Sequence, residues 1–144
     1  MFALLTRLIV VPMSLATSTP AAPPVAATFD AVVSVPVQMK RDSMTVTIQP
    51  AKRIEVKLVM KKGEKATFEW ATNGAEVGYN LHGEVPTDPS VKAHIYQRGS
   101  SKAEKGSIEA VFDGVHGWSW RNTGDRPVTV TVKATGQFSA LKTM

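Results

Sequence analysis

Apolar residues alternate with polar ones along most of this chain. In the runs 44–48, 54–60, 77–82 and 128–132, the apolar side chains recur at every second position. A period of two places one set of side chains on each face of a β-strand, and antiparallel sheets commonly bury one face and expose the other. No window of helical length carries a 3.6-residue apolar period. The pattern therefore predicts an all-β protein built from antiparallel strands.

Turn residues divide these runs at short intervals. Asn73-Gly74 predicts a type I′ hairpin turn between two alternating runs, and two longer loops are expected at 83–90 and 97–107. About eight or nine short strands in one domain indicate a two-sheet antiparallel β-sandwich of the jelly-roll or GOLD-like kind. The expected strands are 30–38, 43–49, 53–61, 65–72, 75–82, 91–97, 107–112, 116–122 and 127–135, with a further one near 137–142.

Residues 1–27 differ from the rest of the chain. They carry a single charge, Arg7, followed by an apolar stretch and then small residues and prolines. This order is typical of a secretory signal peptide. A short membrane anchor is the alternative, although its prolines disfavour a spanning helix. We therefore expect a β-sandwich domain at 28–144, located in the periplasm or elsewhere outside the cytoplasm. It would be soluble after cleavage or tethered through residues 1–27, its only membrane contact.

Composition narrows the function classes. The chain has no cysteine, which excludes disulfides and thiol chemistry, and its net charge of +5 is spread along the strands. Nucleic-acid-binding proteins concentrate their cations on one face or helix, so no nucleic-acid partner is expected. The lysines at 57, 61, 62 and 65 are expected to form a solvated hairpin tip. Motifs for a nucleophile elbow or a phosphate loop are absent, and we predict that the protein is not an enzyme.

Two histidines, His82 and His116, stand at predicted strand ends, and each is followed by glycine. If those ends meet, the two imidazoles could share a copper or zinc ion. The third ligand would be His94 or one of the nearby carboxylates, Glu84, Asp88 and Asp113. The ordinary alternative is a pair of polar strand ends that make hydrogen bonds. No ligand spacing in the sequence separates these interpretations.

Trp118 and Trp120 share one face of their strand with His116. Two indoles in line could form a platform for a sugar ring or another envelope polymer. The chain has only three Trp, two Tyr and five Phe, so its core needs most of these rings. We therefore expect Trp118, Trp120 and also Trp70 mainly inside the sandwich.

Several segments together resemble a family of small bacterial proteins described as transmembrane anchor proteins. They are 55–63 (EVKLVMKKG), 80–84 (NLHGE), 112–122 (FDGVHGWSWRN) and 127–130 (PVTV). The segment 116–122 also resembles, more weakly, the last hairpin of GOLD (emp24-like) domains. The first resemblance implies an N-terminal membrane segment followed by an extracytoplasmic β domain, and the second implies partner binding. Neither supplies catalytic residues.

These observations give one leading hypothesis and two alternatives. The leading hypothesis is a non-enzymatic, exported β-sandwich that binds a partner or ligand at the cell envelope. One alternative is a small periplasmic metal-binding protein that uses His82 and His116. The other is carbohydrate or envelope-polymer binding on Trp118 or Trp120.

Overall fold

The computed structural model describes residues 38–144, and this part of the chain consists of β-strands and turns with no helix. It accordingly contains no helix long and apolar enough to span a membrane. The predicted segment 1–27 and nearly all of the predicted strand 30–38 lie outside the described residues. The strands are β1 (Lys40–Ile48), β2 (Arg53–Met60), β3 (Lys65–Thr72), β4 (Val77–Glu84), β5 (His94–Ser101), β6 (Ala103–Glu109), β7 (Gly114–Arg121), β8 (Val128–Gly136) and β9 (Ala140–Thr143).

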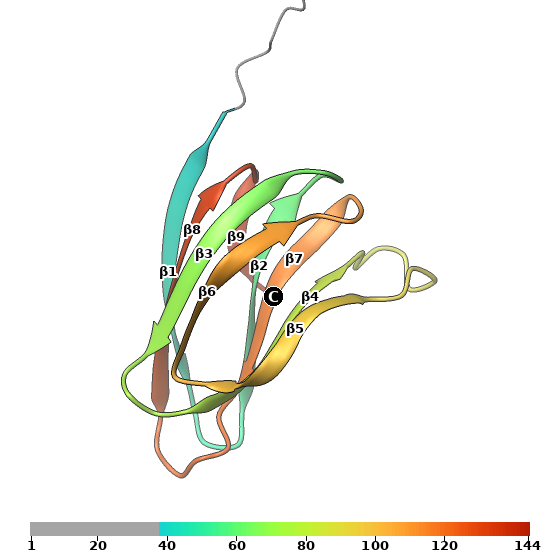
Figure 1. Ribbon diagram of the computed structural model, residues 1–144. Coiled ribbons are helices and arrows are strands. Elements are labelled where there is room, and N and C mark those ends of the chain that lie inside the picture. The colour runs from blue at the N-terminus through green and yellow to red at the C-terminus, as the bar shows by residue number, and fades with distance from the viewer. Residues whose placement is uncertain (1–37) are drawn as a thin grey trace, which may run out of the picture. The chain divides into compact units, whose positions relative to one another are not determined.

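The strands form two antiparallel sheets (Figure 1), which confirms the predicted β-sandwich. One sheet has the order β1-β8-β3-β6, and the other has the order β5-β4-β7-β2-β9. Successive strands alternate between the sheets, except that β4 and β5 pair directly. This alternation is the connectivity of an eight-stranded jelly roll, to which β9 adds a short edge strand beside β2.

The predicted hairpin at Asn73-Gly74 is wrong. The turn is present, and Gly74 has a φ of 109°, but it carries the chain from β3 in one sheet to β4 in the other. The segment after β7 likewise leads to β8 in the opposite sheet rather than to a paired strand. A local turn signal identifies where the chain reverses, whereas the sheet that receives the next strand depends on long-range pairing.

The predicted loop at 97–107 is also wrong. Strand β5 continues to Ser101, and β6 begins at Ala103. Both are edge strands, and nearly all of their side chains are exposed or only half-buried. With little apolar face to bury, these strands lack the alternation that identified the others.

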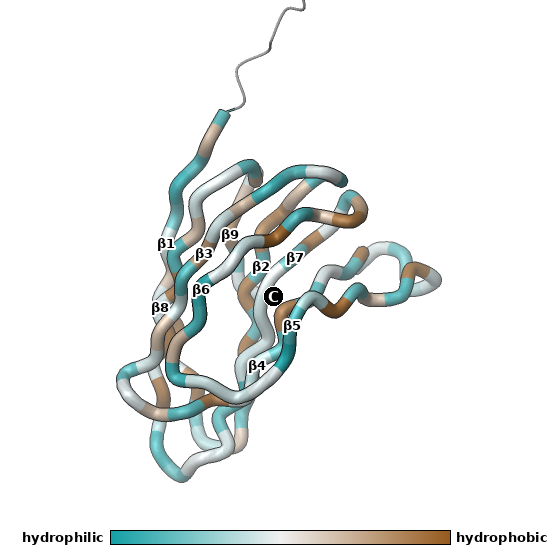
Figure 2. Tube along the Cα trace, viewed as in Figure 1, coloured by the Kyte–Doolittle hydropathy of each residue, from teal (hydrophilic) through white to brown (hydrophobic). Residues whose placement is uncertain are grey.

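The core lies between the two sheets and is dominated by aromatic rings. The indoles of Trp118 and Trp120 are stacked, with ring centroids 5.7 Å apart and planes 3° from parallel. Phe68 and Trp70, from the opposite sheet, meet them edge-on at 5.0 and 5.7 Å. Figure 2 shows hydrophobic and hydrophilic residues alternating along the strands. The buried hydrophobic residues fill this core. The prediction that Trp70, Trp118 and Trp120 belong mainly to the core is confirmed.

The outer face of the five-stranded sheet carries polar side chains near its centre. Residues directly opposite each other in an antiparallel pair lie on the same face of the sheet. The register places Lys57 beside Gly117 and Gly117 beside His82, so these three positions form one row across β2, β7 and β4. This row and its neighbours build the candidate site.

Candidate metal centre

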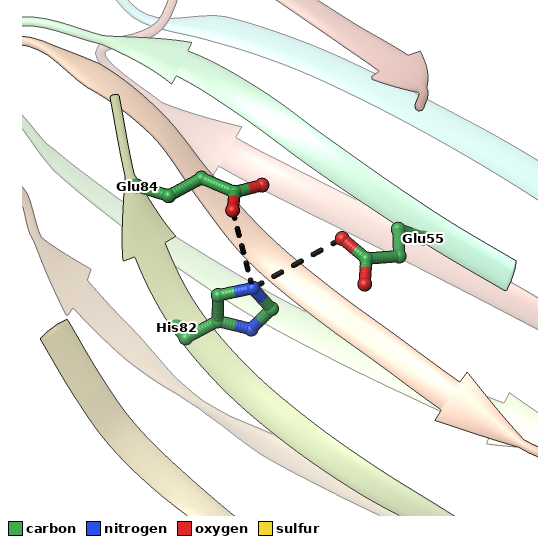
Figure 3. Close-up of side chains that lie close together, drawn as sticks. All are labelled: Glu55, His82 and Glu84. Atoms are coloured by element: carbon green, nitrogen blue, oxygen red, sulfur yellow. Dashed lines mark ion pairs between the residues drawn. The ribbon is translucent and has the colours of Figure 1, made fainter. Parts of the chain in front are cut away.

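Three potential metal ligands meet on the outer face of the five-stranded sheet. His82 and Glu84 come from β4, and Glu55 comes from β2. Nε2 of His82 lies 4.0 Å from Oε2 of Glu55 and 4.0 Å from Oε2 of Glu84. One ligand atom from each residue lies within 4.8 Å of the other two. Figure 3 shows the imidazole pointing between the two carboxylates.

Lys57 inserts its ammonium into the same cluster. Its Nζ lies 2.6 Å from Nε2 of His82, 3.4 Å from Oε1 of Glu84 and 3.5 Å from Oε2 of Glu55. The Lys57 side chain has no exposed surface, whereas Glu55 and Glu84 keep 26% and 34% of theirs. A buried ammonium is strongly unfavourable unless it is paired and hydrogen-bonded. The cluster is thus a cation site, and in this structure the cation is the protein's own lysine.

The hydrogen bonds of His82 assign its tautomer. Nδ1 lies 3.2 Å from the backbone carbonyl oxygen of Asn80, which can only accept a proton, so Nδ1 carries the hydrogen and donates it. Nε2 is then unprotonated, and it accepts from the ammonium of Lys57. A metal-ligating histidine usually has this arrangement, in which one nitrogen is free and the other is fixed by a carbonyl. His82 is therefore already oriented as a ligand through Nε2.

Gly117 allows Lys57 to reach His82. The two side chains come from β2 and β4, which are separated by β7. At this row β7 has a glycine, so no side chain stands between them. A Cβ at Gly117 would lie 2.3 Å from the carbonyl oxygen of Val56 and 2.9 Å from Cα of Lys57. Glycine is therefore required here both for the approach of β2 and β7 and for the path of the lysine.

Burial lowers the pKa of Lys57 below its ordinary value of 10.5, and the carboxylates of Glu55 and Glu84 oppose that shift only in part. Desolvation disfavours the charged form of an amine, and nearby negative charges favour it. The ammonium of Lys57 consequently gives up its proton more readily than that of a surface lysine.

The structure does not bring His82 and His116 together. His82 lies opposite Gly117, and His116 lies opposite Gly83, so the two imidazoles stand on opposite faces of the sheet. His116 points into the sandwich and occupies the space beside Gly83, where a Cβ would lie only 2.3 Å from its Nδ1. The predicted two-histidine site is thus not formed, because adjacent positions on paired strands alternate between faces.

Both ring nitrogens of His116 have protein partners. Nδ1 lies 2.8 Å from the hydroxyl of Tyr96, and Nε2 lies 3.0 Å from the carbonyl oxygen of Phe112. Burial lowers the pKa of His116, and the hydrogen bond to Phe112 opposes this shift. His116 fits the ordinary interpretation of a hydrogen-bonded structural histidine. His94, the other predicted third ligand, is exposed and packs its ring against Tyr96.

The proposed carbohydrate platform is enclosed. Trp118 and Trp120 both have 0% of their surface exposed, so neither ring offers a face to a sugar. The predicted solvated tip is wrong at Lys57, which is fully buried, whereas Lys61, Lys62 and Lys65 are exposed.

Sequence reasoning missed Glu55 and Lys57 as site residues. A signal for them exists, because Glu55 and Lys57 are two positions apart, as are His82 and Glu84. Each pair therefore shares the polar face of its strand. The sequence does not show that β7 lies between β2 and β4, which is what brings the two pairs together.

In comparisons with known proteins, no protein-family model and no curated protein matches the sequence. Among solved structures, the chain is similar to the Yersinia pseudotuberculosis-derived mitogen, with 16% sequence identity and a TM-score of 0.46, over 67% of this chain and 85% of that one. It is also similar to a de novo designed double-stranded β-helix, with 18% identity and a TM-score of 0.39, over 65% of this chain and 97% of that one. The resemblances to transmembrane anchor proteins and to GOLD domains remain predictions.

Proposed function

We propose that this chain is a non-enzymatic, exported binding domain of the cell envelope whose ligand is a divalent transition-metal ion. The ion is held by Glu55, His82 and Glu84. The observation that carries this proposal is the convergence of three ligand atoms within 4.8 Å of one another around a buried cation. The N-terminal segment 1–27, with the composition of a signal peptide or anchor, supports export.

The donor set favours particular metals. One imidazole nitrogen and two carboxylate oxygens suit zinc(II) or copper(II), whereas copper(I) prefers the sulfur ligands that this site lacks. Tetrahedral ligands at bond lengths of ~2.1 Å lie ~3.4 Å apart. Both distances from Nε2 of His82 to the carboxylates are 4.0 Å. His82 and each carboxylate therefore need to close by about 0.6 Å, and the two carboxylates, which lie within 4.8 Å of each other, by at most about 1.4 Å. Half-buried glutamates accommodate such shifts through rotamer changes.

Titration of the full chain with zinc(II) and copper(II), followed by calorimetry and histidine NMR, tests this function. We expect one ion per chain, a shift of the His82 resonances, and tighter binding of copper(II), which precedes zinc(II) in the general order of affinities. The His82→Ala and Glu84→Gln substitutions should each weaken binding by more than the roughly 10–100-fold typical of outer-shell substitutions.

The matched control is His94→Ala, which removes an exposed imidazole outside the cluster. It should leave affinity and stoichiometry unchanged. Equal binding by the wild type and the His82→Ala variant would refute the site. An equal loss in His82→Ala and His94→Ala would mean that the metal binds histidines at the surface in general.

A further inference from the structure

A second feature of the same sheet face is a groove lined by three arginines. Its volume is about 500 Å³, and Arg53, Arg98 and Arg121 contribute to its walls, with Asn80 and Ser119 between them. The groove reaches Glu55 and His82 at one end. It belongs to the outer surface of the five-stranded sheet, because these positions share the face of Lys57 and His82.

The register concentrates the arginines. Arg53 on β2 lies directly opposite Arg121 on β7, and Arg98 on β5 lies opposite Asn80 on β4, one row away on the same face. Like charges directly opposite each other on a sheet are destabilising. A bound anion would relieve this repulsion.

These arginines are not neutralised by the rest of the domain. Within residues 38–144, the ion pairs at 4.0 Å or less involve lysines and His82 but none of the three arginines. The one carboxylate in the groove, Glu55, is paired with Lys57 at 3.5 Å. Ser119 also lines the groove. The groove thus presents several donors and uncompensated positive charge.

The floor of the groove is open at Gly78. A Cβ added there would meet its nearest atoms, both in Arg121, at 3.9 and 4.0 Å, which is ordinary contact. The absence of a side chain at this position leaves room beside Arg121, and Arg53 on β2 and Arg98 on β5 line the same groove.

From this arrangement we infer that the groove binds a phosphate-type oxyanion, independently of the metal ion. The planar forks of arginine match phosphate oxygens in bidentate fashion. A tetrahedral dianion presents more oxygens to the three arginines that line the groove than a carboxylate does. Inorganic phosphate and a terminal phosphoryl group on a small molecule share this chemistry.

The test is a titration of the full chain with inorganic phosphate and with glycerol phosphate, in the presence of a metal chelator, followed by backbone NMR. Saturable shifts in β4, β5 and β7 are expected. Arg98→Gln and Arg121→Gln should each weaken binding about tenfold or more, because hydrogen bonds to charged groups are strong. Gly78→Leu should also weaken it, by filling the groove without removing a charge.

Arg41→Gln is the matched control, since Arg41 is an exposed arginine of the other sheet. It should bind phosphate like the wild type. The chelator removes metal ions from the titration, which separates this inference from the metal site. Absence of saturation at millimolar phosphate overturns the inference. An equal loss with Arg41→Gln also overturns it, because it would indicate a general charge effect. In a parallel titration with vesicles of anionic phospholipid, binding to the vesicles but to neither small anion would overturn it in favour of a membrane surface. Binding of both small anions supports it, and a preference for glycerol phosphate assigns the groove to phosphate esters.

Discussion

Replacing Lys57 with methionine should increase the affinity of the site for zinc(II). Nε2 of His82 has a single lone pair, and it accepts a hydrogen bond from the ammonium of Lys57 at 2.6 Å. A metal ion needs the same lone pair and the same two carboxylates. Binding therefore requires Lys57 to lose its proton or to leave the cluster. In either case the lysine competes with the metal, and its removal abolishes the competition.

The structure bounds the size of this effect. If Lys57 stays in place and loses its proton, the penalty at pH 7 is set by the difference between its pKa and the pH. Its pKa lies below the ordinary 10.5 because of burial, so the penalty is less than 3.5 pH units. This limit corresponds to about 4.8 kcal/mol, or about a 3,000-fold change in affinity. We expect Lys57→Met to bind zinc(II) at least about tenfold more tightly, within that limit.

Calorimetry at several pH values, in buffers with different protonation enthalpies, measures both affinity and protons released. If Lys57 stays in the cluster and loses its proton, the wild type should release one proton per zinc ion more than Lys57→Met, and its affinity should rise more steeply with pH. If the ammonium leaves the cluster, the two proteins should differ in affinity alone. Lys142→Met is the matched control, because Lys142 on β9 lies beside Lys57 in the sheet but is exposed. Unchanged affinity and unchanged proton release in Lys57→Met, in a variant shown by thermal melting to be folded, would refute the competition.

Three further predictions concern the scaffold. Gly117→Ala should destabilise the domain by several kcal/mol in denaturant unfolding, because its Cβ would lie 2.3 Å from the carbonyl oxygen of Val56 on the paired strand; a stability equal to that of Gly78→Ala, where space is open, would contradict this. Burial lowers the pKa of His116, so at this residue the unfolded chain gains a proton at a higher pH than the folded chain does. The free energy of unfolding should therefore fall as the pH drops below 6.5, and this contribution should be absent in His116→Gln. Asn122 is buried and donates to the carbonyl oxygens of Ile48 and Arg126 at 3.0 and 2.7 Å; Asn122→Ala should lower the unfolding free energy by about 2–4 kcal/mol, and a loss below 1 kcal/mol would show that water replaces the amide.

The strands could be predicted because burial on one face leaves a period of two in the sequence. Strand β3 was expected at 65–72 and occupies those residues, since its side chains alternate fully between core and solvent. The strand predicted at 91–97 is displaced from β5, which occupies His94–Ser101, because most residues of β5 are exposed and leave no pattern. Sheet membership was not predictable, because the turn at Asn73-Gly74 is compatible with a hairpin and with an arch between sheets. Only the pairing of β3 with β8 and of β4 with β7 decides between them.

The alternation of side chains along a strand also made part of the candidate site predictable. His82 and its proximity to Glu84 follow from the alternation of one strand. The choice of His116 as the partner of His82 was wrong because the two residues lie on opposite faces of the sheet. A shift of one residue in the pairing is enough to move a side chain from one face to the other. His116 pairs with Gly83 rather than with His82, and that single position sends its ring into the core. No feature of the two His-Gly dipeptides specifies this register.

Gly117 links the fold to the chemistry of the site. Neighbouring strands lie about 4.8 Å apart, so β2 and β4 are separated by roughly 10 Å at the row where Lys57 and His82 face each other. The lysine and imidazole together cover that distance only if they lie across β7, and a side chain on β7 would occupy their path. The lysine side chain on this path has no exposed surface, and this burial lowers its pKa. If Lys57 instead extended into water, its ammonium would stay hydrated and protonated. It would then not occupy the cluster and would not compete with a metal ion for His82. The glycine therefore allows this polar face to hold the buried lysine that a metal ion would displace under the proposed function.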